Sequence, residues 1–141
     1  MRILGLDVGS KTIGVAISDP FNLTAQGLTT IHWDENDMTS ADEALRQIID
    51  EYEVKKIVVG FPKNMDGSTG ERANITNIYA NRLARNFSIP VELYDERLST
   101  MSAERTLLEA DVSRKKRKKV IDQLAATIIL QNYLDKYNIG R

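Results

Sequence analysis

The 141-residue sequence predicts an α/β fold in which helices cover both faces of one mixed five-stranded sheet. Two apolar segments flank a Gly-Ser-Lys turn near the N-terminus, a pattern typical of a β-hairpin. A short continuous apolar run at 56–61 is typical of a strand buried on both faces. Segments of helical spacing separate the later strands, as crossovers between parallel strands require. We therefore expect three antiparallel strands first, followed by parallel strands.

The first half of the chain contains the three antiparallel strands and the first helix. The hairpin covers residues 2–19, and residues 23–33 alternate loosely enough to form a third strand. Either Thr39 or Ser40 can cap the helix that follows, and Glu43 lies at capping-box distance from Ser40.

The second half alternates helices and strands. A helix is expected at about 71–87, a strand at 90–96, a short helix from Ser99 or Thr100 to Leu108, and a long helix at 120–137. The candidate core positions of the helix at 71–87 are Ala73, Ile75, Ile78, Tyr79, Leu83 and Ala84. No repeat or linker interrupts the pattern, so residues 1–141 are expected to form a single domain.

The composition excludes several kinds of site. The chain has no cysteine, which excludes disulfides and cysteine-ligated zinc or iron–sulfur centres. Its single histidine, His32, excludes a multi-histidine zinc site and a pair of catalytic histidines. No apolar run approaches the roughly 18 residues of a membrane span, and the sequence opens directly into a strand without a signal peptide. We expect a cytoplasmic protein with no membrane contact.

The net charge of −1 hides an asymmetry between the two ends of the chain. Residues 1–110 carry 11 Lys and Arg against 17 Asp and Glu, whereas residues 111–141 carry 8 against 3. Six consecutive cations account for most of this difference: Arg114, Lys115, Lys116, Arg117, Lys118 and Lys119. Such a run is usually a solvated segment. Because it precedes a helix that contains a candidate catalytic acid, we favour contact with a phosphate backbone.

Three acidic residues occupy positions that suit metal ligands. Asp7 stands among apolar residues at the end of the first strand, where an unpaired charge is costly to bury. Glu96 ends the strand at 90–96, and Asp122 lies near the border of the buried face of the last helix. Each acid alone has a simpler explanation, because Asp7 can cap its own turn and the other two can be solvated.

Four motifs, at residues 6–16, 59–68, 95–100 and 122–126, make the chain resemble a known family. In this order and within this length they resemble the YqgF/RuvX family, whose members are described as Holliday junction resolvases or pre-16S rRNA nucleases. The resemblance extends over the whole chain and implies an RNase H-like fold. The order of strands and helices derived above agrees with that fold independently.

The resemblance also implies that Asp7, Glu96 and Asp122 converge as a catalytic, metal-binding triad. Carboxylates are the hard oxygen ligands that suit Mg²⁺ or Mn²⁺. Two such ions about 4 Å apart can activate a water and stabilise the leaving oxygen of a phosphodiester. Asp95 alternates with Glu96 along the strand and should face the other way, so we prefer Glu96 as the ligand.

Other residues are candidates for holding the substrate. Ser10, Lys11 and the amides of their turn can hold a phosphate, or they can form a plain hairpin turn. Arg97 can act beside the acidic site or form a structural salt bridge. The six cations at 114–119 would contact backbone phosphates without reading the bases.

The predicted function is therefore a metal-dependent nuclease that acts on nucleic acid, in 5′-end processing of precursor 16S rRNA. Two alternatives stay open: a resolvase of branched DNA, and a non-catalytic nucleic-acid-binding module. A resolvase makes paired cuts and needs a symmetric dimer, whereas a processing nuclease can work as a monomer. The sequence does not decide between monomer and homodimer.

Overall fold

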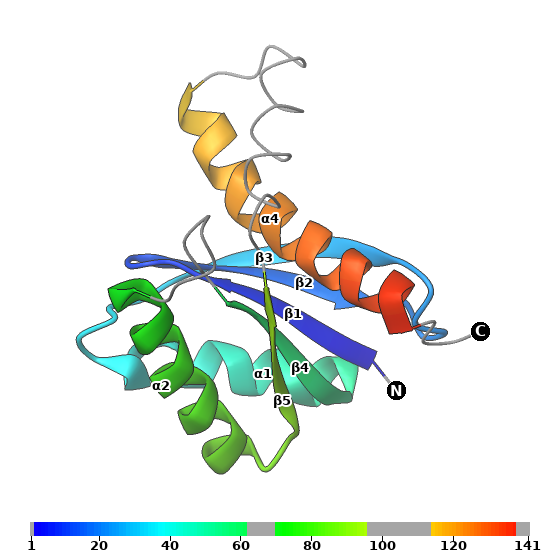
Figure 1. Cartoon of the computed structure of the whole chain (residues 1–141), viewed down its shortest axis with the longest axis horizontal. Coiled ribbons are helices and arrows are strands. Elements are labelled where there is room, and N and C mark those ends of the chain that lie inside the picture. The colour runs from blue at the N-terminus through cyan, green and yellow to red at the C-terminus, as the bar shows by residue number, and fades with distance from the viewer. Residues whose placement is uncertain (1, 62–69, 96–113, 138–141) are drawn as a thin grey trace.

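The computed structural model describes residues 2–61, 70–95 and 114–137, of which 114–122 are placed as helix backbone only. In this part of the chain, one five-stranded sheet has the order β3-β2-β1-β4-β5 (Figure 1). Its strands are β1 (Arg2–Val8), β2 (Thr12–Ser18), β3 (Ala25–His32), β4 (Val54–Phe61) and β5 (Val91–Asp95). β2 is antiparallel to both β1 and β3, while β4 is parallel to β1 and β5 is parallel to β4. The predicted mixed sheet is confirmed.

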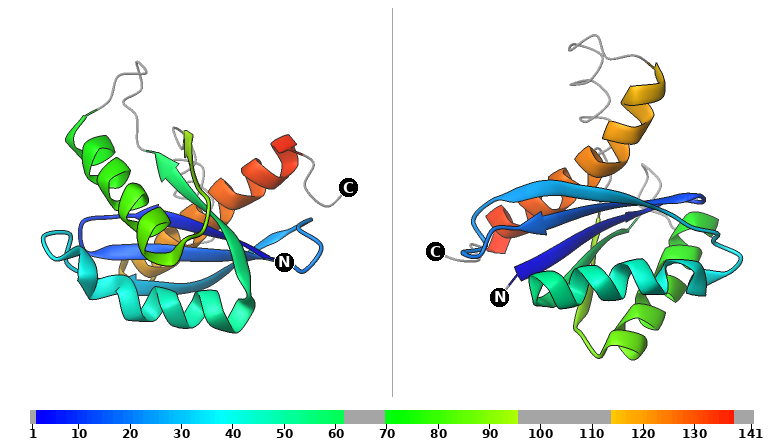
Figure 2. Two further views of the ribbon diagram at one scale, coloured as in Figure 1. Left: turned by 90° about the horizontal axis from the view of Figure 1, so that it is seen from below. Right: turned by 180° about the vertical axis from the view of Figure 1, so that it is seen from behind.

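Helices cover both faces of this sheet (Figures 1 and 2). On one face lie α1 (Asp42–Tyr52), which follows a 3₁₀ turn η1 (Met38–Ala41), and α2 (Glu71–Phe87), which has the predicted bounds. On the other face lies α4 (Arg114–Tyr137). The helix expected from Ser99 or Thr100 to Leu108 is outside the described residues. Among the helices that the structure describes, none is long and apolar enough to cross a membrane.

The central strand β1 contributes alternate residues to two separate cores, as the pleat of a strand requires. Leu4, Leu6 and Val8 are buried against α1 and α2, whereas Ile3 is buried against α4. β4 behaves in the same way, because Ile57 and Val59 belong to the first core and Val58 to the second. The run at 56–61 is therefore a strand buried on both faces, as expected.

The predicted cap of the first helix is wrong. α1 begins after Ala41, which makes no side-chain capping bond. Asp37 instead caps the preceding 3₁₀ turn by accepting from the Thr39 amide at 3.2 Å. The Ser40 hydroxyl lies inside that turn and donates to the Asp37 carbonyl at 2.7 Å, so it does not cap α1.

The last helix is longer than predicted. α4 begins at Arg114 rather than at Val120, so the basic run forms its first turns and is not a separate segment before it. Lys and Arg are good helix formers, and no Gly or Pro interrupts the run, so nothing local stops the helix. In Figure 1 and in the right-hand view of Figure 2 the first turns of α4 extend past the strands.

Gly5 allows α4 to lie directly on the central strand. A Cβ atom at Gly5 would lie 2.8 Å from Leu130 Cβ and 3.2 Å from the Ala126 carbonyl oxygen. The first distance is shorter than side-chain carbons tolerate, and neither neighbour is the end of a flexible side chain. The lack of a side chain at Gly5 therefore sets how closely α4 approaches the sheet.

Replacing Gly5 with Ala should push α4 away from β1 and lower the free energy of unfolding by about 1–3 kcal/mol. Gly27→Ala is a matched control on the same face, because its Cβ would first meet the flexible Gln123 amide at 3.3 Å. Urea unfolding of both variants tests this. Equal losses in the two variants would show that the approach at Gly5 is not the tight one.

Candidate functional site

Asp7 lies on the α4 face of the sheet, near the end of β1. It is half-buried and has the same parity along the strand as Ile3 and Gly5, which face α4. In the register of the sheet Asp7 is paired with Gly14 on β2, and Gly14 is paired with Thr30 on β3.

Glycines occupy the positions beside Asp7 on both neighbouring strands. Gly14 is its partner on β2, and on the other side Gly60 follows Val59, the β4 partner of Leu6. Neither glycine has a side chain, so neither neighbouring strand places one against the Asp7 carboxylate in this row. The two glycines therefore leave space beside the carboxylate for a group bulkier than a single hydrogen-bond donor.

The backbone of Asp122 lies at the same end of the sheet as Asp7. α4 runs antiparallel to β3, because Ala25 is bonded to Gln131 whereas Thr30 is bonded to Gln123, nearer the start of the helix. It is therefore also antiparallel to β1, since β1 and β3 are both antiparallel to β2. Asp7 is two residues beyond Gly5, about 7 Å along the strand. Asp122 is four residues before Ala126, about 6 Å along the helix in the same direction. The two backbone positions therefore lie toward the same end of the sheet.

Two glutamines attach α4 to strand β3. The Gln123 amide donates to Thr30 Oγ1 at 3.4 Å. Eight residues later, Gln131 Oε1 accepts from the Ala25 amide at 2.9 Å, and its Nε2 donates to the Leu23 carbonyl at 3.1 Å. These bonds fix the rotation of the helix about its axis, and with it the face on which Asp122 stands. Nothing in the sequence pattern indicated a role for either glutamine.

The turn that follows Asp7 is held to the core by Trp33. The Gly9 amide donates to the Thr12 carbonyl at 2.8 Å, while the buried Trp33 indole donates to the Gly9 carbonyl at 2.9 Å. Ser10 and Lys11 are exposed at the tip, as a phosphate-binding role requires. The sequence analysis missed Trp33, although a lone tryptophan at the end of a strand was an available signal.

Tyr79 supports Trp33 from α2. Their ring centroids are 4.6 Å apart, and Tyr79 is fully buried. Burial raises the pKa of the Tyr79 phenol, and the nearby Asp42 carboxylate raises it further against the opposing effect of Arg82. The phenol therefore stays neutral even at pH values above the ordinary tyrosine pKa and adds no charge beneath the site.

Arg72 holds the end of β1 from the other side. Its guanidinium donates to the Val8 carbonyl at 3.1 Å and forms an ion pair with Glu35. Arg72 lies in the first turn of α2, so it joins that helix to the residue that directly follows Asp7. Nothing in the sequence pattern indicated this contact.

The structure describes only some of the remaining predicted site residues. Glu96 and Arg97 lie outside the described residues, and the cations at 114–119 are described as helix backbone alone. Asp95 is two residues after Leu93 on β5, so the two residues face the same side of the sheet. Leu93 packs toward α1 and α2, which agrees with the expected orientation of Asp95 away from α4. Among the side chains that the structure does describe, no group of three His, Cys, Asp or Glu could hold a metal ion.

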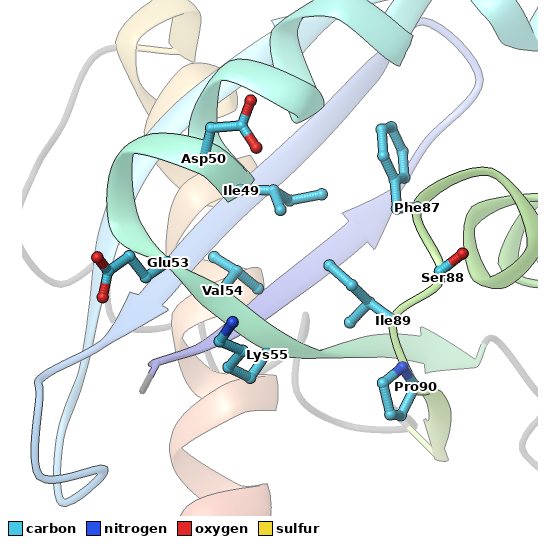
Figure 3. A pocket seen from close by; sticks show the side chains of 9 residues that line it. All are labelled: Ile49, Asp50, Glu53, Val54, Lys55, Phe87, Ser88, Ile89 and Pro90. Carbon is cyan, nitrogen blue, oxygen red and sulfur yellow. The ribbon is translucent and has the colours of Figure 1, made fainter.

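A pocket of about 690 Å³ lies at the opposite end of the sheet (Figure 3). It is lined by the end of α1, the start of β4 and the segment between α2 and β5: Ile49, Asp50, Glu53, Val54, Lys55, Phe87, Ser88, Ile89 and Pro90. Val54 is paired with Arg2, at the start of β1, whereas Asp7 is near its end. This pocket is not part of the candidate site.

A family model described as "RuvX: Holliday junction resolvase" matches residues 1–136. The chain belongs to the RuvX family. Two relatives named "Putative pre-16S rRNA nuclease" agree with this. The protein from Oceanobacillus iheyensis is 62% identical over 136 residues, covering 96% of this chain and 99% of its own length. The protein from a Listeria monocytogenes strain is 59% identical over 138 residues, covering 98% and 100%.

Solved structures of junction resolvases share the fold of this RuvX-family chain. RuvC from Thermus thermophilus, in complex with a Holliday junction, superposes with a TM-score of 0.60 at 12% identity, covering 98% of this chain and 96% of RuvC. The Fowlpox virus resolvase gives 0.58 at 15% identity, covering 97% and 99%. At this identity the likeness establishes the RuvC-like, RNase H-like fold alone.

Proposed function

We propose that this chain is a single-domain, metal-dependent nuclease that cleaves phosphodiester bonds during maturation of the 5′ end of precursor 16S rRNA. The relatives that share 59–62% of its residues, over nearly their whole length, are named for that substrate. The DNA junction resolvases share only the fold, at 12–15% identity, and a fold by itself does not define a substrate.

The observation that supports the proposal is the half-buried Asp7 on the α4 face, beside two glycines, at the end of the sheet toward which the start of α4 lies. We assign Asp7, Glu96 and Asp122 as the metal ligands. Their carboxylates are hard oxygen donors, which fit Mg²⁺ or Mn²⁺. When bound, two such ions supply an activated water and stabilise the leaving oxygen. Without a cation, three adjacent carboxylates would repel one another.

The residues around Asp7 bind and orient the substrate in this proposal. Ser10 and Lys11 are exposed in the turn directly after β1, where a hydroxyl and an ammonium can hold a phosphate. Because the Trp33 indole fixes the Gly9 carbonyl, this phosphate site keeps its position relative to Asp7. Arg97 is assigned to the same substrate surface, on the evidence of its motif.

The basic run contributes one helix face to the proposed substrate surface. Successive residues of a helix turn by about 100°, so six consecutive cations surround α4 on every side. Lys115, Lys118 and Lys119 lie seven, four and three residues before Asp122 and share its face of the helix. We assign the phosphate contacts mainly to these three lysines.

A second function, the resolution of DNA junctions, is favoured by the description of the family model and by the shared fold. Incubating the pure chain with labelled precursor rRNA and labelled four-way junction DNA, in Mg²⁺, Mn²⁺ or EDTA, separates the two. We expect cleavage of the precursor with either ion, none with EDTA, and a sedimenting monomer. Symmetric paired nicks in the junction by a two-subunit complex, with the precursor uncut, would establish the resolvase instead.

Changing Asp7 to Asn, Glu96 to Gln or Asp122 to Asn should each reduce cleavage at least about 100-fold, because each change removes a metal ligand. Each should also raise the unfolding temperature of the metal-free protein, since one repelling charge is lost. Asp95→Asn is the control, because alternation along β5 directs the Asp95 side chain away from α4. This variant should retain activity. Wild-type cleavage by Asp7→Asn would show that the triad is wrongly assigned.

Changing Lys115, Lys118 and Lys119 together to Ala should weaken binding of nucleic acids of any sequence. The slope of log affinity against log salt should fall by about one unit for each lost phosphate contact. The control pair Lys116→Ala and Arg117→Ala lies on the opposite face of α4 and should change both quantities less. Filter binding at several salt concentrations measures this, and equal effects in the two sets would contradict the assigned face.

A further inference from the structure

The end of β1 receives hydrogen bonds from side chains outside the sheet. The paired register between β1 and β4 extends to Leu6, one residue before Asp7. Beyond it, among the strands that the structure describes, β2 is the one neighbour that stays paired with β1, as far as Val8. On the side that β4 no longer covers, Arg72 donates to the Val8 carbonyl at 3.1 Å, and Trp33 donates to the Gly9 carbonyl of the following turn at 2.9 Å. The backbone that follows Asp7 is therefore fixed by two donors from other elements.

Glu35 holds Arg72 in the orientation that reaches Val8. The guanidinium uses Nη1 for the Glu35 carboxylate and Nη2 for the carbonyl, so one planar group makes both contacts. The Arg72 side chain is 37% exposed and that of Glu35 is 24% exposed. An ion pair this accessible contributes little to overall stability, so its main effect is on geometry.

We propose that Arg72 is a positioning residue for the metal site: by holding the Val8 carbonyl, it sets the direction of the Asp7 carboxylate and so the affinity for the divalent cation. This inference rests on the proposed function. A carboxylate that belongs to a ligand set must be held to within about 0.5 Å, so a looser strand end weakens metal binding even when the fold is kept.

The chain provides a matched control on the same helix. Arg82, like Arg72, projects from α2 and forms an ion pair, in this case with Asp42 at the start of α1 at 2.5 Å. Its side chain is similarly accessible, at 26%. Arg82 makes its ion pair with α1 and not with β1. Loss of Arg82 therefore reproduces the loss of a helix ion pair without releasing the strand end.

The test compares Arg72→Gln, Arg72→Lys, Glu35→Gln and Arg82→Gln by calorimetric titration with MnCl₂ and by the Mn²⁺ dependence of cleavage. Arg72→Gln should weaken Mn²⁺ binding about 10- to 100-fold, the usual effect of losing a residue that orients a ligand. Cleavage at saturating Mn²⁺ should recover to within a few-fold of wild type. Arg72→Lys and Glu35→Gln should give smaller changes in the same direction, and Arg82→Gln should bind Mn²⁺ like wild type.

The outcomes separate this inference from the proposed function. Unchanged Mn²⁺ affinity in folded Arg72→Gln, or equal losses in Arg72→Gln and Arg82→Gln, would overturn the positioning role while the nuclease assignment stands. Wild-type protein that binds no Mn²⁺ and cuts neither nucleic acid would overturn the proposed function, and the positioning role with it. If Arg72→Gln does not fold, Arg72→Lys and Glu35→Gln decide the question by the same titration.

Discussion

The close approach of α4 to β1 at Gly5 is the constraint on which the rest of the site depends. The helix backbone lies so near the strand that a single Cβ would meet Leu130 and Ala126. Because α4 is one continuous helix of 24 residues, fixing it at this point fixes the height of Asp122 and of the cations above the sheet. The glutamine contacts to β3 then fix its rotation. Distance and rotation together fix the position of the α4 backbone relative to the end of β1 that carries Asp7.

The face of the sheet that packs against α1 and α2 supports the candidate site without contributing a candidate metal ligand to it. Trp33 and Tyr79 belong to the core under α1 and α2, yet the Trp33 indole reaches the turn that follows Asp7. The site is thus built where both cores meet at the end of β1. Well-packed supports of this kind hold the backbone of the turn that carries the exposed residues Ser10 and Lys11.

The sequence predicted the features that depend on local periodicity. The hairpin, the doubly buried strand at 56–61 and the helix at 71–87 each follow from spacing that the structure confirms. It did not predict where one element meets another. Ile78 has helical spacing with core residues but is 56% exposed, because the buried stripe of α2 runs through Thr76, Tyr79 and Leu83 and leaves Ile78 outside it.

The same limit applies to the candidate site. Asp7 could be selected from its unusual place in an apolar strand, and its half-buried position on the α4 face agrees with that choice. Arg72 and Trp33 could not be given roles, since their partners are 64 and 24 residues away in the chain. Ser40 was misread for a related reason: a capping box depends on which residue starts the helix, and Asp37 had already started a 3₁₀ turn.

The early start of α4 has an electrostatic consequence for the helix itself. Its first turns contain six cations and no acid, so positive charges accumulate at the end where the helix macrodipole is also positive. Pairs such as Lys115 and Lys119 add repulsion between like charges one turn apart. A polyanion lying along these turns would remove both penalties at once. We therefore expect the helical state of this segment to depend on ionic strength and, in the proposed function, on bound nucleic acid.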